Sequence, residues 1–332
     1  MKPTFDILAF GNAIVDIVVS CDDQFLIENN IEKSVMSLIG HDEFSQLYDS
    51  LHRLENPRLV SGGSAANTAV GVVALGGSAS FVGRVFDDHL GRAFRDDILA
   101  AGVEYEQALA SKGLSTASSI IFVTPDAERS MKTFLGASIE LEPQDINNID
   151  LDQAKIIYLE GYLFDAPSGS KIFSEVARKA NECGKKLALS LSDPECVKRH
   201  KIALTEFIVQ HVSILFGNEE EVLELKKKNH QFKSNKLEFI VEELVITQGS
   251  LGANLCSSGD NYFIEPMPQG PVIDTTGAGD LFAAGYLYGR TNGYDIPTSG
   301  NIAAFAAGEV ITQIGARPNC NFQERFKNTL SI

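Results

Sequence analysis

The chain has 332 residues, 44% of them hydrophobic and 22% charged, and can therefore bury a large core in one domain or in one domain with a smaller appendage. Its formal net charge of -16, from 44 acidic and 28 basic residues, argues against a nucleic-acid or anionic-membrane surface and for a small-molecule partner. The five cysteines and six histidines show no CxxC, HxxxH or HxH spacing, so we expect neither a disulfide framework nor a zinc or histidine metal centre.

A short apolar run at residues 5–10 predicts a buried strand that ends at Gly11-Asn12, where functional residues are expected. Asp16 follows between two β-branched residues. A carboxylate there is costly to bury without partners, so either strand alternation exposes it or it serves as a ligand group. Residues 17–45 break the strand–helix rhythm, and we interpret them as an excursion from the main sheet.

The next motif is Ser61-Gly-Gly-Ser-Ala-Ala-Asn-Thr-Ala69, which leads into an apolar helix. Its two glycines allow close backbone approach, and Asn67 on the first helical turn presents a neutral donor and acceptor. This arrangement suits a polyhydroxylated ligand, and tight packing of the helix on a sheet is the alternative explanation for the small residues. Residues 78–83 then predict a strand, and residues 88–101 predict a helix with a core-facing stripe.

Residues 118–124 and 130–135 flank a Pro-Asp-Ala-Glu turn and predict a β-hairpin. Consecutive strands of this kind are foreign to an alternating α/β core. Arg129, at the start of the second hairpin strand, either reaches a phosphate or remains a solvated edge charge.

The hairpin and the earlier excursion predict a division of the chain into two parts. Residues 17–44 and 105–135 are expected to form one small β lid that is discontinuous in sequence. Residues 1–16, 45–104 and 136–332 are expected to form a large α/β domain.

From residue 155 onward, strands and helices alternate regularly, which predicts a parallel sheet with helices on both faces. The predicted strands are 155–160, 186–191, 211–216 and 243–247, and the predicted helices are 169–182, near 198–209 and from 218. Ligands bind at the carboxyl ends of such strands. Three polar clusters fall there: Ser192-Asp193, Asn218 to Glu221, and Thr247 to Gly249. Glu221 either stabilises the dipole of the helix that it begins or holds Mg²⁺ through water.

The most informative motif is Asp274-Thr-Thr-Gly-Ala-Gly-Asp-Leu-Phe-Ala-Ala-Gly285, a polar turn that runs into a buried small-residue helix. The first amides of a helix lack intrahelical partners and carry partial positive charge, and the glycines let a phosphate approach the backbone. A phosphate would repel Asp280 if Asp280 were only a binding group, so a role as base toward an attacking hydroxyl fits better. A Gly-rich turn whose aspartate only caps a helix is the alternative.

In order, and across nearly the whole chain, these pieces resemble the ribokinase-like (PfkB) family of carbohydrate and nucleoside kinases. The signature at 274–285 and the motif Gly62-Gly-Ser-Ala-Ala-Asn67 lie far apart, which makes chance agreement improbable. Within the family the chain is most similar to the adenosine kinases, through Gly11-Asn12 with Asp16, the stretch from Ile214 to Glu221, Glu128-Arg-Ser130 and Thr247-Gln-Gly249. The resemblance implies a three-layer α/β sandwich around a mostly parallel sheet, with a small discontinuous β lid.

The resemblance implies an ATP-dependent kinase that phosphorylates the 5′-hydroxyl of a purine nucleoside, with adenosine favoured. A PfkB sugar kinase for ribose or fructose is the alternative within the class, and a non-catalytic nucleoside- or sugar-binding protein is the alternative outside it. By this similarity Asp280 is the catalytic base. The amides of Gly277, Ala278 and Gly279 form an anion hole, and Arg129 approaches the transferring phosphate.

The resemblance also implies the binding residues. Those for the acceptor are Asn12, Asp16, Gly62, Gly63, Ser64 and Asn67. Those for ATP are Asn218, Glu221, Thr247, Gln248 and Gly249, with Glu221 holding Mg²⁺ through water. A monovalent cation such as K⁺ maps onto Asp274, Thr276, Gly315 and Asn319. We expect a monomer or homodimer that acts in purine salvage without nucleic-acid or membrane partners. It is expected in the cytoplasm, because the start lacks a signal-peptide core and no apolar run approaches the roughly 18 residues of a membrane span.

A nucleoside differs from a free sugar by its flat base, which needs an apolar slot. The predicted lid contains apolar residues that offer such a slot, namely Phe25, Leu26, Ile27, Ile31, Met36, Leu38, Ile120, Phe122, Phe134 and Leu135. Much of this apolar content must hold the lid itself together. A few of these side chains facing the cleft would favour a nucleoside over a sugar.

Overall fold

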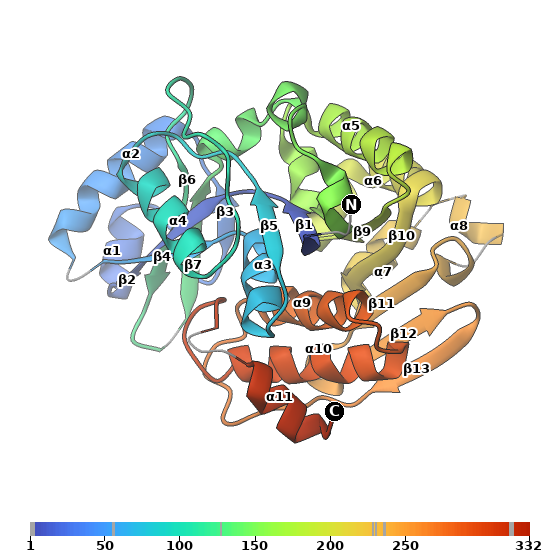
Figure 1. Ribbon diagram of the computed structural model, residues 1–332. Coiled ribbons are helices and arrows are strands. Elements are labelled where there is room, and N and C mark those ends of the chain that lie inside the picture. Colours follow the sequence, from blue (N-terminus) through green and yellow to red (C-terminus); the bar gives the residue numbers. More distant parts are fainter. Residues whose placement is uncertain are drawn as a thin grey trace.

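The computed structural model describes residues 4–54, 57–126, 128–227, 229, 231–234, 237–318 and 322–332. Within these ranges the strands form two sheets, one of eight strands and one of five. Figure 1 shows helices on both sides of the larger sheet, with the smaller sheet and its own helices at the left of the molecule. The larger sheet and its two helical layers form the predicted three-layer α/β sandwich. No helix in the described part of the chain combines the length and the apolar character that a membrane crossing requires.

The larger sheet is mostly parallel. Its strands, in spatial order, are β13 (Asp260–Ile264), β12 (Ala253–Ser257), β11 (Glu243–Thr247), β10 (Val212–Asn218), β9 (Lys186–Ser190), β8 (Ala154–Glu160), β1 (Phe5–Phe10) and β5 (Ala79–Val82). Neighbouring pairs from β11 to β5 are parallel, whereas β12 and β13 extend one edge as an antiparallel hairpin. Because the parallel strands end at one edge of the sheet, the polar residues that follow them meet there.

The smaller sheet is assembled from distant parts of the chain. Its strands, in spatial order, are β3 (Met36–Leu38), β7 (Arg129–Phe134), β6 (Ala117–Val123), β2 (Ile14–Ser20) and β4 (Arg58–Gly62). The antiparallel pair β6–β7 is the predicted hairpin. The chain enters this sheet directly after β1 and leaves it through Gly63 into α3 (Ser64–Ala74). Residues 11–13 and Gly63 therefore lie where the two sheets meet.

Two helical layers cover the larger sheet. On β1, Ile7 and Ala9 join one hydrophobic cluster while Leu8 and Phe10 join the other, as strand alternation requires. One layer contains α3, α9 (Ala278–Thr291), α10 (Ile296–Val310) and α11 (Gln323–Leu330). The other contains α5 (Gly169–Glu182), α6 (Pro194–His211) and α7 (Glu219–Lys226), with α8 (Gln231–Ser234) near the same edge. The helices beside the smaller sheet are α1 (Asp23–Glu28), α2 (His41–Ser50) and α4 (His89–Ala100).

The alternation of elements predicted from residue 155 onward is confirmed, with small shifts at the boundaries. The smaller sheet differs from the expected lid in two places. β4 pairs with β2 although residues 45–104 were assigned to the large domain, and β2 begins at Ile14, ahead of the expected boundary at 17. Only the last two residues of β4 are buried, so its sequence shows no alternation that predicts a strand. The division into two domains remains a prediction.

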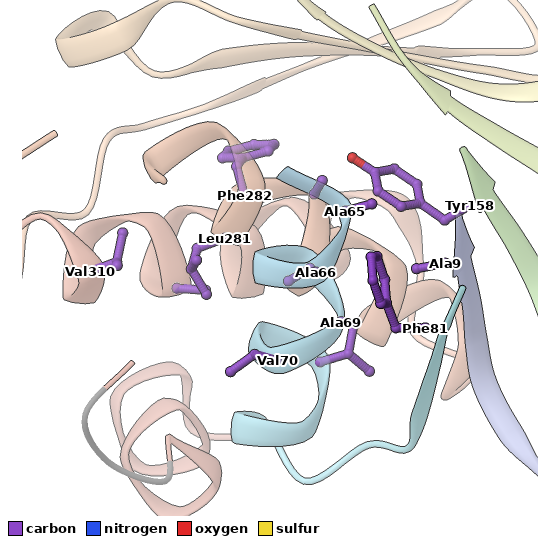
Figure 2. Packing of buried hydrophobic residues seen from close by; sticks show 14 of the residues in the cluster. Ala9, Ala65, Ala66, Ala69, Val70, Phe81, Tyr158, Leu281, Phe282 and Val310 are labelled. Carbon is purple, nitrogen blue, oxygen red and sulfur yellow. The ribbon is translucent and has the colours of Figure 1, made fainter. Parts of the chain in front are cut away.

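Small residues let α3, α9 and α10 pack closely. A Cβ on Gly71 of α3 would lie 2.6 Å from Ala284 Cβ of α9, and a Cβ on Gly285 of α9 would lie 2.5 Å from Ala303 Cα of α10. Figure 2 shows α3 and α9 side by side, with Ala66 among the buried residues at their contact. Ala66 belongs to the first motif, so at least one small residue of that motif serves tight packing. This packing also brings the first turn of α3 next to the first turn of α9.

Candidate active site

Asp280 lies in the first turn of α9, and two side chains of α3 hold its carboxylate. Ser64 Oγ donates to Oδ1 over 2.7 Å, and Asn67 Nδ2 donates to Oδ2 over 2.9 Å. Burial raises the pKa of Asp280, and the hydrogen bonds from Asn67 and Ser64 oppose that rise. A carboxylate that is partly buried and oriented in this way is suited to accept a proton from a nearby hydroxyl.

The start of α9 requires glycine at Gly277 and leaves Gly279 open. Gly277 has φ 79°, and a Cβ there would lie 2.5 Å from the Cβ of Ala316. Gly279 is exposed, and a Cβ built on it meets nothing within 4 Å. Of the three amides predicted for an anion hole, that of Ala278 already donates to the carbonyl of Thr275 over 3.2 Å. The helix start remains a place where partial positive charge meets open space.

A cavity of about 450 Å³, which we call the inter-sheet pocket, lies between the two sheets. It contains four of the six residues predicted for the acceptor, namely Asn12, Asp16, Gly63 and Ser64. Its other lining residues are Ile14, Met36, Leu38, Ser119, Thr133, Leu135, Glu160, Tyr162, Asp165, Asp193, Glu195 and Arg199. Gly62 and Asn67 do not line it. Gly62 lies in β4 with its carbonyl bonded to Arg317, and Asn67 is engaged by Asp280.

The polar end of the inter-sheet pocket is suited to an uncharged ligand with hydroxyl groups. Asn12 is buried, and its Oδ1 has no hydrogen-bond partner among the described residues, so it is ready to accept from a ligand. Glu160 accepts from the backbone N–H of Asn12 over 2.6 Å and from that of Ala65 over 2.8 Å. Burial raises the pKa of Glu160 to about 8 and that of Asp16 to about 7. Carboxylic groups that are partly protonated near neutral pH can both donate to and accept from the hydroxyl groups of a ligand.

The other end of the inter-sheet pocket is apolar. Met36, Leu38 and Leu135 line it, and the first two are about half exposed. Most of the other apolar residues predicted for the lid lie in its core: Phe25, Leu26, Ile31, Ile120, Phe122 and Phe134 are buried there, whereas Ile27 is exposed. Most of the predicted lid residues thus pack against one another, and the role of Met36, Leu38 and Leu135 as a surface for a base remains a prediction.

A second cavity of about 610 Å³, the α9 pocket, lies on the other side of the α9 start. Its lining is largely apolar and includes Met267, Phe282 and Ile311. Among the residues predicted for ATP and the anion hole, it contains Asn218, Thr247, Gly249, Ala278 and Gly279. Gln248 was also predicted to bind ATP but does not line this pocket. Its side chain donates to Glu219 Oε1 over 2.6 Å, on the exposed surface.

A small cavity of about 110 Å³ lies next to both pockets; we call it the junction cavity. It shares Ser64 with the inter-sheet pocket and Gly279 with the α9 pocket. Asp280 and Glu221 both line it. Asp280 therefore lies at the point where a molecule in one pocket would meet a molecule in the other.

Glu221 both begins α7 and faces the junction cavity. It accepts from Asn218 N over 2.9 Å and from Asn218 Nδ2 over 2.7 Å, and its own N–H donates to Asn218 Oδ1. Burial raises the pKa of Glu221 to about 7. Among the described residues no cluster of three or more His, Cys, Asp or Glu could hold a metal directly. A single carboxylate facing a cavity fits Mg²⁺ that keeps several waters and takes its other ligands from a phosphate.

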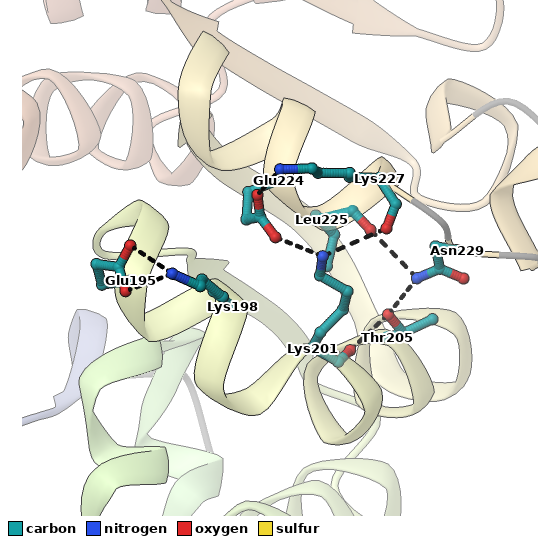
Figure 3. Close-up of polar contacts among 8 residues, drawn as sticks. All are labelled: Glu195, Lys198, Lys201, Thr205, Glu224, Leu225, Lys227 and Asn229. Carbon is teal, nitrogen blue, oxygen red and sulfur yellow. Dashed lines mark hydrogen bonds and ion pairs between the residues drawn. The ribbon is translucent and has the colours of Figure 1, made fainter.

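Contacts with α6 hold α7, and with it Glu221, in place (Figure 3). Lys201 of α6 donates to Glu224 Oε1 over 2.5 Å and to the carbonyl of Lys227 over 3.3 Å. Asn229 Nδ2 donates to Thr205 Oγ1 over 2.6 Å. These bonds join the second half of α7 and the residues after it to the long helix α6. The first turn of α7, which contains Glu221, therefore has a defined position at the junction cavity.

The residues predicted for a monovalent cation do not fit one in this arrangement. Asp274 Oδ1 accepts from Thr276 N and Oγ1, and Oδ2 accepts from Gly315 N and from Arg129 Nη2. Four donors occupy the roughly four lone-pair positions of this carboxylate. Burial acts to raise the pKa of Asp274, but these bonds together lower it. Asn319, the fourth predicted ligand, lies outside the described residues.

Arg129 thus pairs with Asp274 at 2.9 Å and also donates to Thr276 Oγ1 at 3.0 Å. Its predicted position near the transferring phosphate is consistent with this contact, because the loop that it grips leads directly into Gly277. The interpretation of Arg129 as a solvated edge charge is wrong, because its guanidinium donates to Asp274 and Thr276 in the loop ahead of α9.

Sequence reasoning missed two residues of the site. Glu160 is the last residue of β8. A polar residue at the end of a parallel strand predicts a ligand group, so the sequence did contain a signal for Glu160. Arg317 donates through Nε to Asn67 Oδ1 over 3.2 Å, at a separation of 250 residues. A lone arginine after a Gly-Ala pair carries no motif, so no sequence signal pointed to it.

The comparisons with known proteins agree with the resemblance to the PfkB kinases. A sequence profile described as pfkB family carbohydrate kinase matches residues 31–322. A probable sugar kinase from Rhizobium etli CFN 42 superposes with a TM-score of 0.89 at 40% identity, covering 99% of this chain and 100% of that one. The adenosine kinase from Sinorhizobium meliloti superposes with a TM-score of 0.88 at 39% identity, covering 98% and 99%. Adenosine kinase 2 from Arabidopsis thaliana is 25% identical over 346 residues, 96% of each chain.

Proposed function

The chain belongs to the pfkB family of carbohydrate kinases, phosphotransferases with an alcohol acceptor, and we propose that it transfers the γ-phosphoryl group of ATP to the 5′-hydroxyl of adenosine. The observation that carries this proposal is that Asp280 lines the junction cavity, which shares lining residues with both larger pockets. The inter-sheet pocket takes the nucleoside, the α9 pocket takes the adenine end of ATP, and the junction cavity takes the phosphates.

In this mechanism Asp280 removes the proton from the attacking hydroxyl. Ser64 and Asn67 keep its carboxylate aimed into the junction cavity, and burial makes it a stronger base than an exposed aspartate. The open start of α9 at Gly279 receives the charge that develops on the transferred phosphoryl group. When bound with ATP, Mg²⁺ offsets phosphate charge, and Glu221 with Asn218 would hold its hydration shell.

The acceptor is proposed from the two ends of the inter-sheet pocket. Asn12 and Asp16 offer hydrogen-bonding groups for ribose hydroxyls, while the apolar end formed by Met36, Leu38 and Leu135 offers a surface for the base. Burial of apolar area is worth about 25 cal/mol per Å², so a base against this surface would add several kcal/mol that a free sugar lacks. The similarity to the adenosine kinase from Sinorhizobium meliloti, at 39% identity, supports the same choice.

A sugar kinase is the second candidate. The protein from Rhizobium etli, at 40% identity, is described as a probable sugar kinase. The inter-sheet pocket also holds several carboxylic side chains, among them Asp165, Asp193 and Glu195, and hydroxyls of a sugar could donate to such groups. A sugar would leave the apolar end of the pocket uncovered, which is the reason for ranking it second.

The test is ADP release with ATP and Mg²⁺, measured across adenosine, inosine, guanosine, ribose and fructose at matched concentrations. We expect adenosine to give the highest kcat/KM, with free sugars lower by at least about 10²-fold, since roughly 1.4 kcal/mol of lost transition-state binding is tenfold. A free sugar as the best acceptor would overturn the nucleoside assignment. Binding of nucleosides without ADP release from any acceptor would instead indicate a non-catalytic binding protein.

A further inference from the structure

A line of polar contacts runs from the C-terminal segment through α3 to Asp280. Arg317 Nε donates to Asn67 Oδ1 over 3.2 Å, and Asn67 Nδ2 donates to Asp280 Oδ2 over 2.9 Å. Arg317 Nη2 also donates to the carbonyl of Gly62 over 3.2 Å. Arg317 therefore reaches the candidate base through the side-chain amide of Asn67.

The chemistry of these three groups permits one orientation of the amide. A guanidinium has only donors, and an ionised carboxylate only accepts. The oxygen of Asn67 must face Arg317 and its nitrogen must face Asp280, because the flipped amide would set donor against donor on one side and acceptor against acceptor on the other. Without a donor at Arg317, only Asp280 still fixes the orientation of the amide, and the side chain of Asn67 is held at one end instead of two.

The surroundings of Arg317 keep its guanidinium charged and in place. The guanidinium lies over the ring of Phe94, 5.5 Å from the ring centroid. Burial lowers the pKa of Arg317 to about 10, while the charges of Asp97 and Asp16 act to raise it. Arg317 is therefore charged at neutral pH. A buried charge is costly unless opposite charge lies nearby, and the carboxylate of Asp97 supplies such a charge.

We propose that Arg317 is a positioning residue that fixes the Asn67 amide and thereby holds the Asp280 carboxylate ionised and aimed at the acceptor hydroxyl. The proposal rests on the proposed role of Asp280 as base. It adds a residue that touches neither the acceptor nor the phosphates and whose effect passes through one hydrogen bond.

Loss of the Arg317 donor should raise the pKa of Asp280. The polar and titratable groups around this carboxylate are Ser64 and Asn67 on α3, Tyr158 and Glu160 on β8, and Glu221 on α7. Burial raises the pKa of Asp280 and a charged Glu160 would add to the rise, whereas the bonds from Asn67 and Ser64 lower it. An Asn67 side chain that Arg317 no longer holds moves more freely and weakens one of the two lowering contacts. The acidic limb of the pH profile of kcat would then move to higher pH.

Two substitutions at Arg317 form a matched pair. Arg317→Gln places an amide nitrogen as far along the side chain as Arg Nε, whereas Arg317→Met places a methyl group there. We expect Arg317→Met to raise the pKa of Asp280 and to lower kcat near neutral pH by roughly tenfold, the effect of one lost charge-assisted hydrogen bond. Arg317→Gln should keep the pKa of Asp280 and kcat close to their natural values. The pKa is read by NMR on ¹³C-carboxyl-labelled aspartate, with the Asp280 signal assigned by its absence in Asp280→Asn.

Asn67→Ala completes a double-mutant cycle. If Arg317 acts through Asn67, Arg317→Met should change neither kcat nor the pKa further in the Asn67→Ala background. Equal losses in the Met and Gln variants, or additive losses in the cycle, would overturn the proposal and leave Arg317 a charge or packing residue. If Arg317→Met fails to fold, the comparison of Arg317→Gln with Asn67→Ala provides the test. The pKa of Asp280 should be near its natural value in Arg317→Gln and raised in Asn67→Ala.

The NMR readout separates this proposal from the proposed function. Full activity in Asp280→Asn would overturn the role of Asp280 as base, whatever Arg317 does to its pKa. Loss of activity in Asp280→Asn together with an unchanged Asp280 pKa in Arg317→Met would overturn the role of Arg317 alone.

Discussion

Arg129 Nη2 and Asp274 Oδ2 form an ion pair at 2.9 Å that joins β7 of the smaller sheet to the loop ahead of α9. Only 4% of the Asp274 side chain is exposed, so this carboxylate depends on its four donors for compensation. The pair places a positive charge where a monovalent cation was predicted. It also holds the edge of the smaller sheet against the helix start that is proposed to receive phosphate.

The first prediction is that the natural enzyme needs no K⁺. With Mg²⁺ present throughout, activity should be the same when the monovalent cation of the buffer is K⁺, Na⁺ or an organic ammonium ion, because Asp274 has no free acceptor position among its described contacts. Arg129→Met should lose activity and should gain a dependence on K⁺, since the unpaired buried carboxylate then needs a cation. Arg92→Met, which breaks an exposed pair with Asp87, is the control. Strong activation of the natural enzyme by K⁺ would show that Arg129 does not replace a monovalent cation beside Asp274.

A second prediction separates folding from phosphate binding at the start of α9. Gly277→Ala should destabilise the protein, because left-handed backbone costs a residue with a Cβ about 1–2 kcal/mol and this Cβ would also collide with Ala316. Gly279→Ala has room for its methyl group and should keep the melting temperature. It should still lower kcat/KM for ATP by on the order of 10²-fold, since small displacements of a reacting group cost that much. An intact kcat/KM in Gly279→Ala would argue against phosphate at this helix start.

The third prediction is that the ligand-free protein loses stability as pH rises. The pKa of Glu160 is raised from 4.5 to about 8, so the folded state binds its proton more tightly than the unfolded chain does. The stabilising contribution is complete below 4.5 and is lost as pH rises through about 8. Urea unfolding between about pH 5 and pH 8 measures this slope.

Glu160→Gln should flatten that slope. The variant should be less stable than the natural protein at acidic pH, because a glutamine cannot accept from both Asn12 N and Ala65 N, and the difference should shrink as pH rises. Glu206→Gln, at an exposed position on α6, should leave the slope unchanged. A variant at position 160 with the natural slope would mean that another group controls the pH dependence.

The fourth prediction concerns Mg²⁺. Glu221→Gln should raise the Mg²⁺ concentration needed for half-maximal activity more than it raises the KM of the acceptor, because Glu221 lines the junction cavity, which is proposed to take the phosphates, rather than the inter-sheet pocket. Glu220→Gln, an exposed neighbour on the same helical turn, is the matched control. An unchanged Mg²⁺ requirement would leave Glu221 as the residue that completes the cap of α7.

Much of this architecture could be predicted from sequence because it depends on local pattern. The alternation of strands and helices, the polar strand ends and the Gly-Ala-Gly-Asp280 helix start are each contained in a few consecutive residues. The contacts of Asn67 could not be predicted, because its partners Asp280 and Arg317 lie 213 and 250 residues away and only tertiary packing brings them together. The strand β4 was missed because its partner β2 decides its conformation rather than its own residues.

The same limit applies to Asp274. The resemblance predicted a cation at Asp274, but Arg129 comes from the smaller sheet and donates to the carboxylate that was expected to bind it. Local signals identify which residues belong near a phosphate. They do not identify which of those residues bind one another when no ligand is present.

The most direct test of the account is phosphoryl transfer by the natural enzyme and by Asp280→Asn, with ATP, Mg²⁺ and adenosine. Asparagine keeps the size of the side chain and loses its basicity, so both substrates should bind in calorimetry as before. The natural enzyme should form ADP and adenosine 5′-monophosphate in equal amounts, and the variant should lose on the order of 10²- to 10⁴-fold in kcat. A variant that retains kcat within about tenfold of the natural enzyme would contradict the assignment of Asp280 as the base.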